Sequence, residues 1–225
     1  MKAMILAAGR GERMRPLTDH TPKPLLKVAG KALIEHTIMQ LVMAGFDEIV
    51  INHAHLGQQI EHYLGTGQTL GASIVYSPEG DQALETAGGI INALPLLGNE
   101  PFLVVNGDIA TDFPYAKLQT QGIDLAHLVL VSNPEHHPLG DFALADNSEV
   151  LETGEQKWTF SGIGVYRPEL FYDLPQGVLK LAPLLRAAIQ KQQVSGQLYE
   201  GFWMDIGTPE RLMALDKRLQ NFFLN

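Results

Sequence analysis

The segment MKAMILAAGRGERMRPLT, residues 1–18, joins an apolar run to a loop that is rich in glycine and arginine. Its first eight residues are almost wholly apolar and stop at a glycine, which predicts a buried β-strand. The loop that follows contains Gly9 and Gly11, and glycine frees backbone N–H groups to wrap around phosphate oxygens. An N-terminal strand that leads into such a loop is typical of α/β folds, which bind ligands at the carboxyl ends of their strands.

Strand and helix signals alternate after this opening. The predicted strands are residues 48–54, 72–77, 102–108 and 126–131, and the predicted helices are residues 32–44, 56–64, 86–97 and 115–120. The strand FLVVNGD at 102–108 has a continuous apolar run, as expected of a central parallel strand. This alternation predicts an α/β, Rossmann-like fold with a mixed, mostly parallel central sheet and helices on both faces.

The alternation ends after Pro134, and the second half is richer in β signals. It contains a predicted hairpin at 141–152, strands at 160–166 and 200–207, a helix at 182–192 and a closing helix capped by Thr208 with Pro209 at its first position. No linker rich in Pro, Gly or Ser separates the halves. Residues 1–225 are therefore predicted to form a single domain, with a β-rich second half.

Composition narrows the class of protein. The chain has 225 residues, of which 45% are hydrophobic and 18% charged, as in soluble globular proteins. No apolar run approaches the roughly 18 residues of a membrane span, and the start lacks the pattern of a signal peptide. The chain has no cysteine, which excludes disulfides and thiolate chemistry. We therefore expect a cytoplasmic protein without a membrane partner.

Charge is distributed unevenly along the chain. The net charge of −9 argues against a nucleic-acid partner, yet residues 1–31 carry +5 and the remainder −14. A local basic patch on an acidic protein suits a compact polyanion such as a nucleoside triphosphate. Ordinary solvent-exposed charges with no ligand are the alternative explanation of this uneven distribution.

The glycine loop matches neither of the two common phosphate-binding motifs. A P-loop requires G-x-x-x-x-G-K-[ST], and a dinucleotide loop has a third glycine where this chain has Met14, followed by Pro16. Its arginines can nevertheless add bidentate bonds to phosphate. Downstream, Lys23 is held between Pro22 and Pro24, whose φ angles are fixed. The segment is thus consistent with a phosphate site of another kind.

The longer stretch AAGRGERMRPLTDHTPKPLL, residues 7–26, resembles the signature of the sugar-1-phosphate nucleotidylyltransferases. These enzymes join a nucleoside triphosphate to a sugar 1-phosphate and release pyrophosphate. Three further matches follow in the family's order, namely LETAGGI (84–90), VVNGD (104–108) and WMDIGTPE (203–210). The resemblance covers nearly the whole chain and implies a mainly nucleotide-binding part at 1–133 and a mainly sugar-binding part at 134–225.

The resemblance implies that Arg13 and Lys23 are catalytic and stabilise the triphosphate. It assigns nucleotide binding to Ala8, Gly9, Gly11, Glu12, Arg13, Lys23, Thr86 and Gly88. In this reaction a sugar-phosphate oxygen attacks the α-phosphorus in line, so catalysis rests on positioning and charge neutralisation. An ordinary helix start would also account for Thr86 and Gly88.

Two aspartates are the predicted metal ligands. Asp108 ends an apolar strand at the edge of the sheet where ligands bind, and Mg²⁺ favours one or two carboxylates plus substrate phosphates. The resemblance assigns Asp205 as the second carboxylate, although a turn or cap role is the alternative for either residue. His136 and His137 lie in an apparent loop and are predicted to be solvent-exposed rather than metal-binding.

The resemblance places the sugar against Asn106, Gly140, Asp141 and Glu155. Glu155 matches the acid of the family's E-K-P motif, but the lysine of that motif is replaced here by glutamine or displaced to Lys157. This departure puts the sugar-phosphate contact of that loop in doubt. Lys180, in LKLAPLL, is the alternative.

Within the family, LETAGGI, NHAHLGQQIEHYLG (52–65) and KLAPLLR resemble the members that uridylylate N-acetylmuramate α-1-phosphate in bacterial cell-wall recycling. This implies UTP as the nucleotide and a monomer or small homo-oligomer. Guanylyl transfer to mannose 1-phosphate is the alternative enzyme, and a nucleotide-sugar-binding regulatory module is the non-enzyme alternative. The regulatory module is disfavoured because nucleotide-sugar binding alone does not need both metal-binding carboxylates.

Overall fold

The structure is a computed structural model that describes residues 1–80 and 82–223. Its central sheet has seven strands in the order β12 (Val194–Tyr199), β8 (Ala126–Val131), β11 (Thr159–Tyr166), β6 (Phe102–Asn106), β1 (Ala3–Leu6), β4 (Glu48–His53) and β5 (Ser73–Pro78). Strand β11 runs antiparallel to both of its neighbours, and the other pairs are parallel. The predicted mixed, mostly parallel sheet is confirmed.

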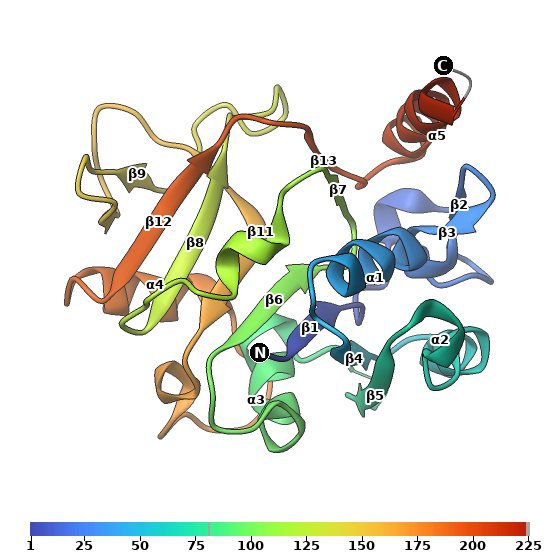
Figure 1. Cartoon of the computed structure of the whole chain (residues 1–225), viewed down its shortest axis with the longest axis horizontal. Helices are drawn as coiled ribbons and strands as arrows, with labels where there is room; N and C mark the ends of the chain where they lie inside the picture. Colours follow the sequence, from blue (N-terminus) through green and yellow to red (C-terminus); the bar gives the residue numbers. More distant parts are fainter. Residues whose placement is uncertain (81, 224–225) are drawn as a thin grey trace.

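Helices cover both faces of this sheet (Figure 1). The α-helices are α1 (Leu33–Met43), α2 (Gly57–Leu64), α3 (Glu85–Leu97), α4 (Leu181–Ile189) and α5 (Pro209–Phe223). Alternation along β1 explains the two layers, because Ala3 and Ile5 belong to the core cluster that contains α1, whereas Met4 belongs to the cluster that contains α3 and α4. Both faces of the sheet are therefore buried.

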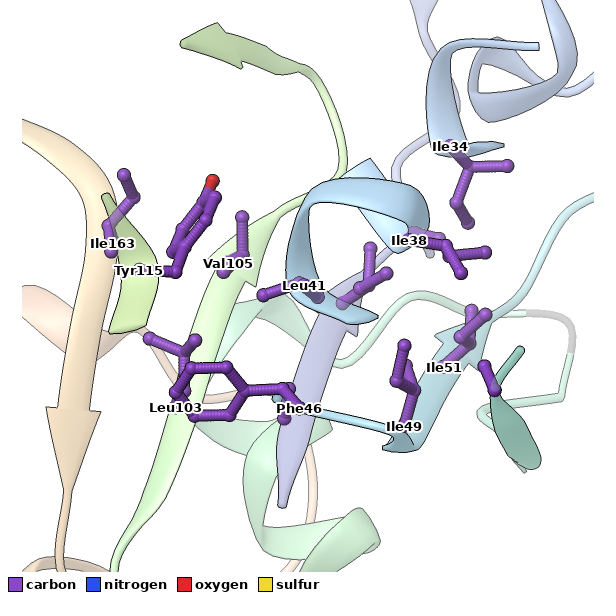
Figure 2. Close-up of a cluster of buried hydrophobic side chains, with 14 of the residues drawn as sticks. Ile34, Ile38, Leu41, Phe46, Ile49, Ile51, Leu103, Val105, Tyr115 and Ile163 are labelled. Carbon is purple, nitrogen blue, oxygen red and sulfur yellow. The ribbon is translucent and has the colours of Figure 1, made fainter. Parts of the chain in front are cut away.

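The cluster under α1 fixes that helix on the sheet. Figure 2 shows Ile34, Ile38 and Leu41, spaced along one face of α1, above Ile49 and Ile51 of β4. All five side chains are almost completely buried. Each contributes about 1.5–3 kcal/mol relative to an exposed side chain, so this face holds α1 against the sheet.

Short elements extend from the edges of the central sheet. The paired short strands are β2 (Lys27–Val28) with β3 (Lys31–Ala32), β7 (Ile109–Thr111) with β13 (Trp203–Asp205), and β9 (Ala143–Leu144) with β10 (Val150–Leu151). The 3₁₀ turns are η1 (Glu12–Met14), η2 (Lys23–Leu25), η3 (Gln68–Leu70), η4 (Tyr115–Leu118) and η5 (Pro168–Phe171). The β7–β13 pair brings the second half of the chain to the end of β6.

The sequence-based prediction missed one strand of the central sheet. Strand β12, which reads VSGQLY, pairs in parallel with β8 at the edge of the sheet. Among its six residues only Val194 and Gly196 are buried, so its pattern lacks the apolar signal of a central strand. Strands β2, β3 and β7 are also outside the prediction, because two or three residues carry no periodicity.

Several predicted boundaries are corrected by the structure. The predicted strand at 200–207 shrinks to β13, and the predicted helix at 115–120 is the 3₁₀ turn η4. The predicted helix at 182–192 is α4, which ends at Ile189. Pro209 at the first position of the closing helix is confirmed, with Thr208 Oγ1 accepting the backbone N–H of Arg211 at 3.4 Å. No helix among the described residues is long and apolar enough to cross a membrane.

A buried histidine makes the stability of the sheet depend on pH. His127 of β8 is 2% exposed, and its Nδ1 lies 2.8 Å from Ser195 Oγ on β12. Burial lowers its pKa, against a weaker opposite effect of the hydrogen bond to Gln197. The unfolded chain therefore binds this proton more readily, so the free energy of unfolding should fall as pH drops below about 6.5.

Urea unfolding of the wild type and of His127→Asn at pH 7.5 and 5.5 measures this effect. The variant should lose less stability between the two pH values than the wild type does, because it has no proton to bind at this position. Equal losses in the two proteins would contradict the assignment.

Candidate active site

The loop after β1 is held open by a left-handed glycine and anchored by a methionine. Gly11 has φ 66°, and its carbonyl accepts the Thr18 hydroxyl at 2.8 Å and the backbone N–H of Met14 at 2.8 Å. The Met14 side chain is fully buried in a cluster with Ile206 and Leu215. Met14, which stands where a dinucleotide-binding loop has its third glycine, thus anchors the loop to the C-terminal half of the chain.

A cavity of about 580 Å³, which we call the loop cavity, opens between this loop and the end of β6. Its lining includes the predicted residues Gly9, Gly11, Glu12, Arg13, Lys23, Thr86, Asn106 and Asp108. Arg10 lines it as well, and both Arg10 and Arg13 are exposed. Neither arginine forms an ion pair within the described residues. The cavity therefore presents uncompensated positive charge to an anion.

Lys23 and Asp108 form an ion pair in the wall of the loop cavity. The Lys23 Nζ lies 2.5 Å from Asp108 Oδ2, and the lysine side chain is 10% exposed against 36% for the aspartate. Lys23 begins the turn η2, preceded by Pro22 in an extended conformation. Asp108 follows Gly107, where a Cβ would lie 2.6 Å from the Leu6 carbonyl oxygen. The glycine thus lets the end of β6 pass close to β1 and carries Asp108 to the sheet edge.

Asp205 is paired with a residue that the sequence analysis did not single out. The Arg211 Nη1 lies 2.6 Å from Asp205 Oδ1 and 2.7 Å from Oδ2, and both side chains are about one fifth exposed. His136 Nε2 lies 2.8 Å from the same Nη1 and 3.1 Å from Asp205 Oδ1. The predicted exposure of His136 is confirmed, but its ring also lies at the rim of the site.

Asp108 lies in the turn between β6 and β7, and Asp205 lies on β13, the strand that pairs with β7. Asp205 of β13 pairs with Ile109 of β7, and the backbone N–H of Ile206 donates to the Asp108 carbonyl at 2.7 Å. Among the described residues no group of three or more His, Cys, Asp or Glu is arranged to hold a metal ion. A two-carboxylate set beside an anion cavity nevertheless fits Mg²⁺, because that ion takes its remaining ligands from phosphates and water.

A second cavity of about 310 Å³, the acidic cavity, lies on the other side of Asp108 and also contains Asp205. A break in the register of β11 between Phe160 and Ile163 places Phe160 and Ser161 along its wall. Asn106 lines both this cavity and the loop cavity. Its side-chain amide makes no hydrogen bond within the described residues, so it is available to a ligand.

A third, smaller cavity of about 250 Å³, the side cavity, adjoins the loop cavity. Ala8, Gly9 and Thr86 line it together with Leu6, Asn52, Glu79, Ala83 and Glu85. Burial raises the pKa of the Glu79 carboxyl, while its hydrogen bonds from Leu84 and Asn52 act in the opposite direction. Gly88 lies one turn along α3, outside this lining, where a Cβ would overlap the Gly177 carbonyl oxygen.

The predicted sugar-binding residues of the second half lie apart from these cavities. Gly140, Asp141 and Glu155 are not among the residues that line the loop, acidic or side cavity. Asp141 Oδ2 accepts the backbone N–H of Phe160 at 2.8 Å and thereby supports the wall of the acidic cavity, whereas Glu155 is exposed. Their direct contact with a sugar stays a prediction. Another cavity of about 520 Å³, between α1 and α5, contains none of the predicted residues.

Comparison with known proteins gives concordant matches. The family model described as nucleotidyl transferase matches residues 2–221. The chain is 57% identical to the N-acetylmuramate alpha-1-phosphate uridylyltransferase of Neisseria meningitidis serogroup B, over 94% of this chain and 95% of that protein. It is 38% identical to the protein of the same name from Caulobacter vibrioides, over 96% of each chain.

Solved structures share the fold. A protein from Bacillus anthracis assigned as a glucose-1-phosphate thymidylyltransferase superposes with a TM-score of 0.83 at 24% identity, covering 98% of this chain and 96% of that one. HddC from Yersinia pseudotuberculosis, complexed with GMP-PN, superposes with a TM-score of 0.78 at 20% identity, covering 97% and 99%. At these identities the likeness concerns the fold alone.

Proposed function

Because this chain belongs to the nucleotidyl transferase family, we propose that it transfers UMP from UTP to N-acetylmuramate α-1-phosphate and releases pyrophosphate. The products are UDP-N-acetylmuramate and pyrophosphate, and we place the reaction in the cytoplasm, in the recycling of bacterial cell-wall sugars. The identity of 57% over nearly the full length of both chains supports this substrate pair over guanylyl transfer to mannose 1-phosphate.

The observation that carries the proposal is the convergence of a buried lysine, two aspartates and two arginines that form no ion pair with the described residues around two adjoining cavities. The triphosphate of UTP occupies the loop cavity, where the backbone at Gly9 and Gly11 approaches its oxygens. Arg13 and Lys23 neutralise the charge that shifts toward the leaving pyrophosphate. The sugar 1-phosphate enters from the acidic cavity, and Asn106 borders both substrates.

This arrangement needs no general base. The attacking group is an oxygen of the sugar phosphate, which is already anionic. Its bond to the α-phosphorus forms as the bond from that phosphorus to the bridging oxygen of the β-phosphate breaks, and pyrophosphate leaves with the electron pair. The chain contributes alignment and fixed positive charge, which matches a site that is rich in Arg and Lys.

Asp108 and Asp205 would hold Mg²⁺, which when bound shields the phosphate charges of the two substrates. Without ligands, Lys23 and Arg211 supply the compensating charge to these carboxylates. The two basic side chains thereby hold both aspartates in place beside the cavities.

The division of the chain between the two substrates and the identity of the sugar-phosphate lysine are further proposals. Strands β12 and β11 of the second half flank β8 of the first half, so residues 1–133 and 134–225 contribute to one sheet. The division into nucleotide and sugar parts, and the choice between Lys157 and Lys180 as the sugar-phosphate lysine, stay predictions. Neither lysine lines the acidic cavity.

A substrate panel tests the proposal. Pyrophosphate release is measured with Mg²⁺, with UTP or GTP, and with the 1-phosphates of N-acetylmuramate, mannose or glucose. The pair of UTP and N-acetylmuramate α-1-phosphate should give the highest kcat/KM. A preference for GTP and mannose 1-phosphate would replace this assignment, and nucleotide binding without turnover of any pair would favour the regulatory module.

A further inference from the structure

Two loops form opposite walls of the side cavity, and a pair of side chains lies between them. The first loop, residues 7–11, follows β1, and the second, residues 82–86, leads into the first turn of α3. Asn52 lies near the end of β4, and Glu79 comes directly after β5. Both line the side cavity.

Three hydrogen bonds in series connect the two loops through these side chains. The backbone N–H of Ala7 donates to Asn52 Oδ1 at 2.8 Å, and Asn52 Nδ2 donates to Glu79 Oε1 at 2.6 Å. The backbone N–H of Leu84 then donates to Glu79 Oε2 at 2.6 Å. Asn52 is 2% exposed, so water does not compete for its bonds. We call this series the Asn52–Glu79 bridge.

The helix above the bridge is shaped to accommodate it. A Cβ at Gly89 would lie 2.7 Å from Asn52 Nδ2 and would overlap Glu79 Oε1. Cβ atoms essentially never lie this close to another heavy atom, so any residue other than glycine at this position would force Asn52 and Glu79 to shift. The second glycine of LETAGGI is thus explained by the bridge beneath it.

The loop that the bridge holds has a strained backbone. Glu85 has φ 61°, a left-handed conformation that is costly for any residue except glycine. Its neighbour Leu84 is held at both backbone groups, since its N–H donates to Glu79 and its carbonyl accepts the N–H of Leu179 at 2.9 Å. The conformation of the loop is therefore imposed by its partners rather than by local preference.

The chemistry of the bridge permits only one arrangement of donors and acceptors. Because Asn52 Oδ1 is occupied by the N–H of Ala7, the asparagine presents its NH₂ to residue 79. Residue 79 therefore faces two donors, the Asn52 NH₂ and the Leu84 N–H, and must accept from both. An ionised carboxylate does so, whereas a glutamine cannot.

We propose that Asn52 and Glu79 are positioning residues that set the separation of the two loops and so make the side cavity selective for a pyrimidine base. The inference rests on the proposed function, which places the triphosphate in the adjoining loop cavity and hence the base in the side cavity. Loss of the bridge frees the loops to separate and admits a larger purine ring.

An exchange of the two side-chain types tests the bridge. Glu79→Gln leaves one donor unpaired, and Asn52→Asp places two carboxylates against each other. The double variant Asn52→Asp/Glu79→Gln satisfies all three bonds again, because the carboxylate now at position 52 accepts from Ala7 and from the amide NH₂ now at position 79, whose amide oxygen accepts from Leu84. Asn92→Ala is the matched control, because Asn92 Nδ2 joins α3 to Ser77 Oγ at 2.9 Å and to the Pro78 carbonyl at 3.2 Å and forms no hydrogen bond with either loop.

Each single variant should raise the KM for UTP about tenfold, the effect of one unpaired buried group, with a much smaller change in the KM for the sugar phosphate. The ratio of kcat/KM for UTP to that for GTP should fall in parallel. The double variant should recover both quantities to within about threefold of the wild type. The Asn92→Ala control should lower Tm without changing the KM for UTP.

Unchanged KM values in the single variants would overturn the inference. Equal damage to both substrates without recovery in the double variant would also overturn it, because the bridge would then act only on overall stability. Failure of the proposed function is a separate result, seen as a wild type that turns over no UTP. Calorimetric titration with UTP then measures the bridge directly, and binding must be lost and recovered in the same pattern.

Discussion

Asp108→Asn is expected to lower kcat by about a thousand-fold in saturating Mg²⁺, which corresponds to about 4 kcal/mol of transition-state stabilisation. The Asp108 carboxylate lines both the loop cavity and the acidic cavity and lies 2.5 Å from Lys23 Nζ. Asparagine preserves the shape of the side chain but removes the negative charge that a divalent cation requires. Pyrophosphate release measures kcat, and electron paramagnetic resonance of bound Mn²⁺ gives the metal affinity independently of turnover.

Asp112→Asn provides a matched control for this change. Asp112 follows β7, accepts the backbone N–H of Phe202 at 2.8 Å and the Tyr199 hydroxyl, and lies outside the loop and acidic cavities. Its asparagine variant should keep kcat within about threefold of the wild type while Tm falls, because the hydrogen bonds that Asp112 accepts serve only the fold. Near-normal activity of Asp108→Asn in saturating Mg²⁺ would show that the metal role is wrong.

Features that depend on neighbouring residues were predictable from the sequence. The strand that leads into the glycine loop, the polar end of β6 and Pro209 at the start of α5 all follow from local chemistry. Since the carboxyl ends of parallel strands meet at one edge of a sheet, the approach of Asp108 to the loop after β1 also follows. The structure places Asp108 and the loop after β1 around one cavity.

Features that depend on partners distant in the chain were not predictable. The bond between Asn52 and Glu79 joins the ends of two strands, and neither residue carries a local signal of its partner. Arg211 reaches Asp205 because α5 turns back at Pro209, a direction that helical periodicity does not specify. Strand β12 was missed for a related reason, since an edge strand takes its stability from its neighbour rather than from its own apolar residues.

Lys23→Met should lower kcat by about a hundred- to a thousand-fold and raise the KM for UTP while the protein stays folded. Methionine matches the length of the lysine stem, which is nine-tenths buried beside Gly11 and Pro24, so the packing of η2 is retained. The ammonium is lost, and with it the fixed charge nearest to Asp108. The Asp108 side chain is 36% exposed, so water solvates it in the variant and the cost in stability is small.

Comparison with a second lysine tests whether Lys23 acts through a specific contact or only as part of the basic patch of residues 1–31. Lys27 belongs to the same patch but is exposed and outside the loop cavity. If positive charge acts only by attracting the nucleotide, Lys27→Met and Lys23→Met should lower kcat/KM alike, and salt should abolish the difference from the wild type. If Lys23 acts by contact, only Lys23→Met lowers kcat, and the loss persists at high salt. Lys23→Arg should then recover part of the lost kcat, because arginine restores the positive charge with a different shape.

Circular dichroism of each variant verifies the fold. An unchanged kcat in Lys23→Met would remove this residue from the catalytic site.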